Sequence, residues 1–116
     1  MIPGLLFIVT SDPRTNPRPA EAVRIAAGVG AWRKVGVTVY LHGPAVLVLG
    51  EFADDLPDGN NFSRYLPLVS ESGGLIRAQR DAALLSTIGH AAVSFLETSD
   101  DELTELVTKN EYVVHF

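Results

Sequence analysis

The residues best suited to chemistry follow short apolar runs at three places in the chain. Thr10-Ser11-Asp12 supplies hydroxyls and a carboxylate, His42 follows a second apolar run, and Gln79-Arg80 follows a third. If these runs are strands of one parallel sheet, their carboxyl ends meet at one edge, where ligands bind in α/β folds. The sequence therefore predicts one candidate ligand-binding cleft, made of Thr10, Ser11, Asp12, His42, Gln79 and Arg80.

The first of these groups has two interpretations. Together with a following helix N-terminus and Arg14 or Arg18, Thr10-Ser11-Asp12 could hold an anion or a nucleotide phosphate. Alternatively, Ser11 and Asp12 cap a turn through hydrogen bonds from their side chains to the backbone. The chain has no Gly-rich phosphate loop beside them, which favours the turn.

His42 is a candidate general base or ligand, and Arg80 is a candidate anion contact. His90 and His115 lie far from His42 in the sequence and show no metal-ligand spacing, so we expect a hydrogen-bonded structural histidine and no metal. Arg80 could instead form a surface ion pair with Asp81, which would contribute only about 0–1 kcal/mol.

Several chemistries are excluded or disfavoured by the composition. The chain has no cysteine, which excludes disulfides, thiolate metal sites and a thiol nucleophile. It has no GxSxG nucleophile elbow. The acidic residues Glu51, Asp54, Asp55 and Asp58 lack the calcium-loop pattern, so a solvated face is expected. We therefore predict no catalytic residue, no metal and no cofactor.

Length and charge bound the class of protein. The 116 residues suit a single domain over residues 1–116, and 47% hydrophobic with 20% charged residues suits a compact core. A net charge of −5 argues against nucleic acid and acidic lipid as partners. The N-terminus does not resemble a signal peptide, and no apolar run reaches the roughly 20 residues of a membrane helix. A soluble, cytoplasmic protein is expected.

The elements that must position the candidate residues begin with a βαβ unit. Residues 5–10 and 37–41 are short apolar runs typical of strands buried on both faces. Residues 20–34 between them have helical spacing, with Asn16 as a possible N-cap or Pro19 in the first turn, and Gly36 as the C-terminal stop.

The apolar face of this helix is wider than one sheet requires. The face consists of Ala22, Ile25, Ala26, Val29 and Trp32, and three further residues widen it: Val23, Ala27 and Ala31. Gly28 and Gly30 within the helix each cost about 1 kcal/mol relative to alanine. Close packing on a neighbouring helix and a buried subunit contact explain this pattern equally well.

The second half of the chain supplies the remaining elements. Short helices are expected at 45–49 and 81–87, an irregular acidic segment at 50–59, and a helix at 62–69 that Pro67 interrupts. Ser99 and Glu102 form a capping box that begins a helix running to about residue 109. Three further strands are expected at 75–78, 91–96 and 111–116. Five strands alternating with helices predict an α/β fold with three layers, α/β/α, and a mostly parallel sheet.

Three stretches carry a resemblance to a known family. They are Leu5 to Asp12 followed by the Ala-rich helix, Val37-Thr38-Val39-Tyr40-Leu41-His42-Gly43 followed by Ala45-Val46, and Gly73-Gly74-Leu75-Ile76-Arg77-Ala78-Gln79 followed by Ala82-Ala83-Leu84. In this order the chain resembles the DsrE/DsrF-like family, which includes the small sulfur-relay subunits of the Dsr and Tus systems. The resemblance covers most of the chain.

The resemblance implies a relation to sulfur-relay proteins, but this chain lacks the residue that accepts sulfur in them. The third stretch looks like the strand and turn that carry the family's sulfur-accepting cysteine, and Gln79 stands at that position. Since an amide cannot form a persulfide, the resemblance implies a non-catalytic subunit or small-ligand binding module. It also implies a homo-oligomer, trimeric or hexameric, or assembly with related DsrE-like subunits. The alternative is a small enzyme, or a nucleotide- or anion-binding protein, that uses the candidate cleft.

Overall fold

The structure is a computed structural model that describes residues 2–116, and its centre is a five-stranded sheet. The strand order is β4-β3-β2-β1-β5, and each neighbouring pair is parallel. The strands are β1 (Gly4–Val9), β2 (Gly36–Leu41), β3 (Leu75–Gln79), β4 (Leu96–Thr98) and β5 (Tyr112–His115). The predicted α/β class with a parallel sheet is confirmed.

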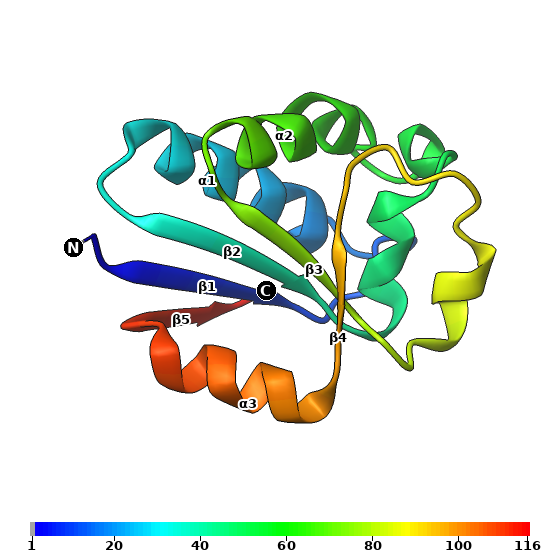
Figure 1. Ribbon diagram of the computed structural model, residues 1–116. Helices are drawn as coiled ribbons and strands as arrows, with labels where there is room; N and C mark the ends of the chain where they lie inside the picture. Colours follow the sequence, from blue (N-terminus) through cyan, green and yellow to red (C-terminus); the bar gives the residue numbers. More distant parts are fainter. Residues whose placement is uncertain (1) are drawn as a thin grey trace.

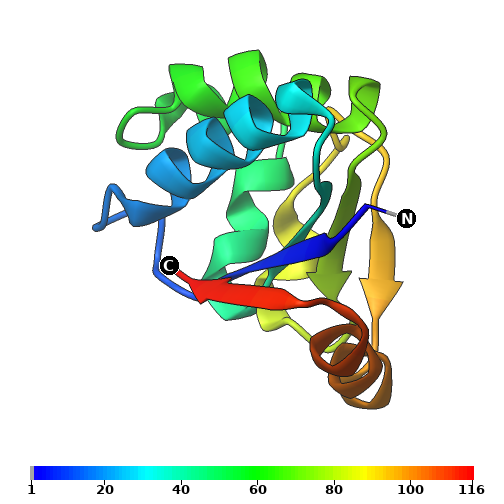
Figure 2. The same ribbon diagram turned by 90° about the vertical axis from the view of Figure 1, so that its left-hand side faces the viewer.

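Helices cover both faces of the sheet (Figure 1). Helices α1 (Arg18–Trp32) and α2 (Asn60–Glu71) lie side by side on one face, and α3 (Asp100–Lys109) lies alone on the other. Figure 2, turned by 90° from the first view, again shows α1 and α2 on one side of the sheet and α3 on the other. We call the two sides of the sheet the α1/α2 face and the α3 face.

Three short 3-10 helices gather beyond the carboxyl ends of the central strands (Figure 1). They are η1 (Gly43–Leu49), η2 (Ala53–Asp55) and η3 (Ala83–Thr87). The short helix expected at 45–49 is therefore present as η1. The helix expected at 81–87 begins only at Ala83, and η2 interrupts the acidic segment that was expected to be irregular.

The width of the apolar face on α1 has an explanation within the chain. Ala22, Val23, Ala26 and Ala27 are all buried, and α1 packs against both α2 and the sheet. A Cβ on Gly30 would lie only 2.8 Å from Ser72 Oγ, at the end of α2. Close packing on a neighbouring helix therefore accounts for these four buried residues, while Trp32 and Ala31, which were predicted on the same apolar face, stay exposed at the end of the helix.

The expected ends of α1 were wrong by about one half-turn at each end. The helix begins at Arg18, whose backbone N–H donates to Asn16 Oδ1 at 2.9 Å. It ends because Arg33 takes a left-handed conformation, with φ of 60°, and Arg33 rather than Gly36 provides the stop. Gly36 is instead the first residue of β2, where it pairs with Gly4.

Two further expectations were wrong. Helix α2 continues through Pro67 to Glu71, because proline removes only one backbone donor and the exposed Ser63 carbonyl beneath it can be solvated. The strand expected at 91–96 is mostly a loop, and β4 begins only at Leu96. The apolar residues of this loop pack on the core instead: Ala91, Val93 and Phe95 are partly buried, and Ala92 N donates to Leu49 O at 3.3 Å.

The predicted start of α3 is confirmed. Ser99 Oγ accepts from the backbone of Glu102, and the Glu102 carboxylate accepts from the backbone of Ser99. Within residues 2–116, no helix has both the length and the apolar character needed to cross a bilayer.

Candidate functional site

The carboxyl ends of the three central strands align in one row. Val9 pairs with Leu41, and Leu41 pairs with Ala78, so Thr10, His42 and Gln79 follow in neighbouring positions. Because side chains alternate along a strand, these three residues point to the α3 face, as Ile8 and Tyr40 do. The structure therefore brings three of the six predicted residues to one place.

Gln79 makes a hydrogen bond that joins two strand ends. Its side-chain Oε1 accepts from the backbone N–H of Gly43 at 2.8 Å. Gly43 has φ of +57°, a conformation that favours glycine, so the turn after β2 is shaped to present this N–H. The side chain of Gln79 thus satisfies the partly buried N–H of Gly43. A fully buried N–H left without an acceptor would destabilise the fold by about 1–3 kcal/mol, and a partly buried one by less.

His42 has a structural partner on the same strand. Its Nδ1 lies 3.4 Å from the hydroxyl of Tyr40, and the two rings are 6.0 Å apart. Tyr40 is fully buried under α3, and burial raises the pKa of its hydroxyl, with a smaller contribution from Asp100. This arrangement agrees with the expected hydrogen-bonded structural histidine.

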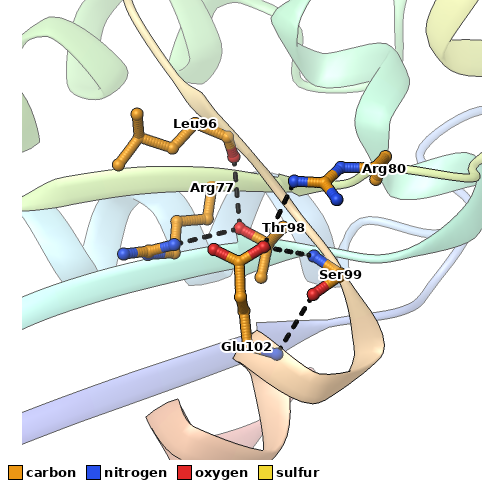
Figure 3. Close-up of polar contacts among 6 residues, drawn as sticks. All are labelled: Arg77, Arg80, Leu96, Thr98, Ser99 and Glu102. Atoms are coloured by element: carbon orange, nitrogen blue, oxygen red, sulfur yellow. Dashed lines mark hydrogen bonds and ion pairs between the residues drawn. The ribbon is translucent and has the colours of Figure 1, made fainter.

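Arg80 turns away from the row towards the start of α3 (Figure 3). Its Nη2 donates to Glu102 Oε1 at 3.2 Å, and the same oxygen accepts from Ser99 N at 3.1 Å. The ion pair considered for Arg80 therefore exists, but its partner is Glu102 rather than Asp81. The pKa of the Glu102 carboxyl lies below its ordinary value, chiefly because Ser99 donates to it and secondarily because Arg80 and Arg77 are nearby.

Arg77 was not among the predicted site residues, although it lies beside them (Figure 3). Its Nη1 donates to the hydroxyl of Thr98 at 3.2 Å, and that hydroxyl donates to Leu96 O at 3.2 Å. Arg77 Nε is buried without a hydrogen-bond partner among residues 2–116. A charged residue inside an otherwise apolar strand is the signal that could have identified it.

Asp12 belongs to a turn rather than to the row. Its Oδ1 accepts from Arg14 N at 2.9 Å and from Arg14 Nε at 3.0 Å, while Oδ2 accepts from Arg14 Nη2 at 2.9 Å. These hydrogen bonds lower the pKa of the Asp12 carboxyl. Thr10 and Ser11 use their backbone N–H groups to bind Phe116 O, at 2.9 and 3.3 Å. The turn interpretation is therefore the one that the geometry of Asp12 supports.

Two cavities lie beyond the strand ends, on the two sides of η3. One has a volume of about 430 Å³ and is lined by Arg14, Leu47, Gly50, Phe52, Ala53, Leu56, Leu84, Thr87 and Ile88. The other has a volume of about 460 Å³, and its lining includes Arg80, Ser86, Phe95 and Glu97. Of the six predicted residues, only Arg80 belongs to either lining. The apolar residues of the first cavity come from two separate segments, 47–56 and 84–88, so spacing along the sequence could not bring them together.

The part of the chain from residue 2 to residue 116 holds no group of three or more acidic or histidine side chains placed to bind a metal ion.

These layers and this strand order define a DsrE-like α/β fold, as the sequence resemblance predicted. Among solved structures, the chain is similar to the ychN protein from E. coli, with a TM-score of 0.83 and 12% sequence identity. The similarity covers 99% of this chain and 100% of that protein's chain. No family model matches the sequence, and no curated protein matches it either. At this level of identity, the likeness establishes the fold.

Proposed function

We propose that this chain is a non-catalytic, cysteine-less DsrE-like protein related to sulfur-relay subunits. It consists of a single domain over residues 1–116, acts in the cytoplasm, and serves as an assembly subunit or small-ligand binding module. The observation that carries this proposal is the hydrogen bond from Gly43 N to Gln79 Oε1.

Gln79 stands where the resemblance places the sulfur-accepting cysteine. Its amide has no nucleophilic sulfur, and its oxygen is already used to hold the turn after β2. Since the chain has no cysteine elsewhere, it cannot carry a persulfide on its own side chains. A structural role for position 79 agrees with a subunit that supports assembly and leaves the chemistry to others.

Assembly is the second part of the proposal. Large hydrophobic side chains remain exposed outside the cavity linings, including Trp32 at 67% and Tyr112 at 56%. Such side chains are available for burial between subunits if assembly brings them together. We expect a homo-oligomer, trimeric or hexameric, or assembly with related DsrE-like subunits. A net charge of −5 disfavours nucleic acid and anionic membranes as partners.

Size-exclusion chromatography with light scattering tests the assembly role. The purified protein should elute as a trimer or a hexamer at tens of micromolar. A clean monomer at that concentration, both alone and when mixed with related subunits, would contradict the proposal.

The role of position 79 has a separate test. Gln79→Cys places a thiol there, and incubation with polysulfide should add sulfur atoms to it, detected by intact mass as increments of one sulfur. In this reaction the thiolate attacks the sulfur chain and the shortened polysulfide leaves. Ser86→Cys on the exposed η3 helix is the control for an ordinary surface thiol, which is more accessible than position 79. If Gln79→Cys reacts no faster than Ser86→Cys, the proposed equivalence with the sulfur-accepting position loses its support.

The alternative, a small enzyme or anion-binding protein using the strand-end residues, has less support. Asp12 binds Arg14, Arg80 binds Glu102, and Gln79 binds Gly43. An incoming ligand would have to break these contacts before it could use the carboxylate of Asp12 or the oxygen of Gln79.

A further inference from the structure

The cavity lined by Arg14, which we call the Arg14 cavity, has the size and position of a ligand site. Its volume of about 430 Å³ falls within the range of roughly 300–1,000 Å³ typical of small-molecule pockets. Segments that follow β1, β2 and β3 all contribute to its wall, so it lies beyond the carboxyl ends of the central strands. Ligands bind at this place in many parallel α/β sheets.

The wall of the Arg14 cavity is mainly apolar. Leu47 comes from η1, Leu56 follows η2, and Leu84 and Ile88 come from η3 and its end. At the rim, Phe52 leaves 71% of its surface exposed, which makes it the most exposed large hydrophobic residue of those described. A ring in that position can gain burial by closing over an apolar ligand.

Arg14 is the one charged residue in the lining, and it is held in place. Asp12 accepts hydrogen bonds from the backbone N–H, the Nε and the Nη2 of Arg14. The Nη1 group takes no part in this pair, so its donors are available to another acceptor. A guanidinium that is already positioned loses little conformational entropy when it binds an anion.

The acidic residues of the neighbouring segment do not line this cavity. Glu51 and Asp54 line a different, smaller depression together with Phe62 and Leu66. The Arg14 cavity therefore combines an apolar wall with one guanidinium, whose charge Asp12 partly balances.

We propose that the Arg14 cavity binds a small organic acid, with its apolar body against Leu84 and Ile88 and its carboxylate on Arg14 Nη1. This inference names a ligand class for the proposed small-ligand binding module, and because the site is separate from Gln79 it does not depend on the role of position 79. Phe52 covers the apolar body at the rim. A charge-assisted hydrogen bond to Arg14 gives the carboxylate an advantage over a neutral group of the same shape.

Calorimetric titration with two matched probes tests this inference. Naphthylacetate carries the carboxylate, and naphthylacetamide has the same apolar body with a neutral amide. The wild-type protein should bind naphthylacetate about tenfold more tightly, in line with the difference between charged and neutral hydrogen bonds. Arg14→Gln should remove this preference, and Phe52→Ala should weaken both probes alike.

Two control variants separate these effects from general changes of the surface. Arg24→Gln removes an arginine that also forms an exposed ion pair, with Glu21 on α1, and should leave both affinities unchanged. Trp32→Ala removes an equally exposed aromatic ring far from the cavity lining. Intermolecular nuclear Overhauser effects from the naphthyl protons to the methyl groups of Leu84 and Ile88 locate the ligand without any substitution.

The outcomes decide the matter in either direction. A carboxylate preference that disappears in Arg14→Gln, with contacts to Leu84 and Ile88, supports the inference. Failure of both probes to bind, equal affinity for both, or a preference that survives Arg14→Gln would overturn it. None of these results depends on the oligomeric state or on the reactivity of position 79.

Discussion

The two faces of the sheet are built in different ways. On the α1/α2 face, α1 and α2 bury residues such as Val23, Ala26, Phe62 and Leu66 in one large apolar cluster. On the α3 face, the buried cluster consists of Leu6, Ile8 and Tyr40, and every residue of α3 keeps part of its surface exposed.

Polar side chains on the α3 face supply contacts that apolar side chains supply on the α1/α2 face. Thr38, Arg77 and Thr98 all lie on the α3 face, and the Arg80–Glu102 ion pair closes its end near the strand carboxyl termini. One face therefore holds the fold together by close packing, while the other is held by fewer apolar contacts and by directional hydrogen bonds. We infer that contacts on the α3 face contribute less to the free energy of unfolding than contacts on the α1/α2 face. Substitutions on the α3 face should therefore be better tolerated.

Removing one leucine from each face should give the largest contrast. Leu66→Ala, on the α1/α2 face where the side chain is 1% exposed, should lower the free energy of unfolding by about 2–5 kcal/mol. Leu106→Ala on α3, where the side chain is only partly buried, should lower it by about 1 kcal/mol. Urea denaturation measures both, and equal losses would mean that α3 is packed as tightly as α2.

The cap of α3 should give the next largest effect. Ser99→Ala removes the acceptor for Glu102 N and should cost about 1 kcal/mol. Ser63→Ala, which removes an exposed hydroxyl inside α2, is the control and should change stability by no more than about 0.5 kcal/mol. If the two variants unfold at the same urea concentration, hydrogen bonding at Ser99 does not hold the α3 face.

The two glycines of α1 test how closely the α1/α2 face is packed. Space around Gly28 is open, so Gly28→Ala should stabilise the protein by about 1 kcal/mol. Gly30→Ala places a Cβ 2.8 Å from Ser72 Oγ, and the resulting strain should cancel that gain or exceed it. In a Ser72→Ala background the obstacle is gone, and Gly30→Ala should then stabilise. A gain from Gly30→Ala in the wild-type background would contradict the close packing described for this face.

The difference between the faces also explains what the sequence could predict. The βαβ unit and the capping box of α3 depend on local patterns, namely apolar runs and the spacing of Ser99 and Glu102, and both were predicted. The loop at 91–95 was mistaken for a strand because its apolar residues pack on the core without pairing in the sheet.

The site depended on contacts between distant parts of the chain, which local patterns do not reveal. Gly43 and Gln79 are separated by 36 residues, and Arg77 and Thr98 by 21. Sequence reasoning identified which strand ends would meet, because parallel strands share an edge, and the row of Thr10, His42 and Gln79 follows from that rule. The partner of each side chain depends on turn geometry, which became visible only in the structure.

The smallest expected effect concerns the charge on Glu102. Its carboxyl has a lowered pKa in the folded protein, so ionised Glu102 stabilises the fold above its ordinary pKa near 4.5, and this contribution disappears as the pH falls through the folded-state value. Glu102→Gln keeps an acceptor for Ser99 N but removes the charge that faces Arg80. The variant should therefore not show the loss of stability that protonation of Glu102 causes in the wild-type protein at acidic pH. The effect is small because Arg80 and Glu102 leave 53% and 44% of their side chains exposed, and water weakens such pairs.

Thermal unfolding followed from neutral to acidic pH measures this contribution. Below pH 4.5, the wild-type protein should lose stability more steeply than Glu102→Gln, while the two should differ little in slope at neutral pH. Glu105→Gln, which removes an exposed carboxylate from the same helix, controls for the change in net charge. If Glu105→Gln reduces the loss of thermal stability below pH 4.5 as much as Glu102→Gln does, the effect comes from overall charge. The Arg80–Glu102 pair then makes no specific contribution to the α3 face.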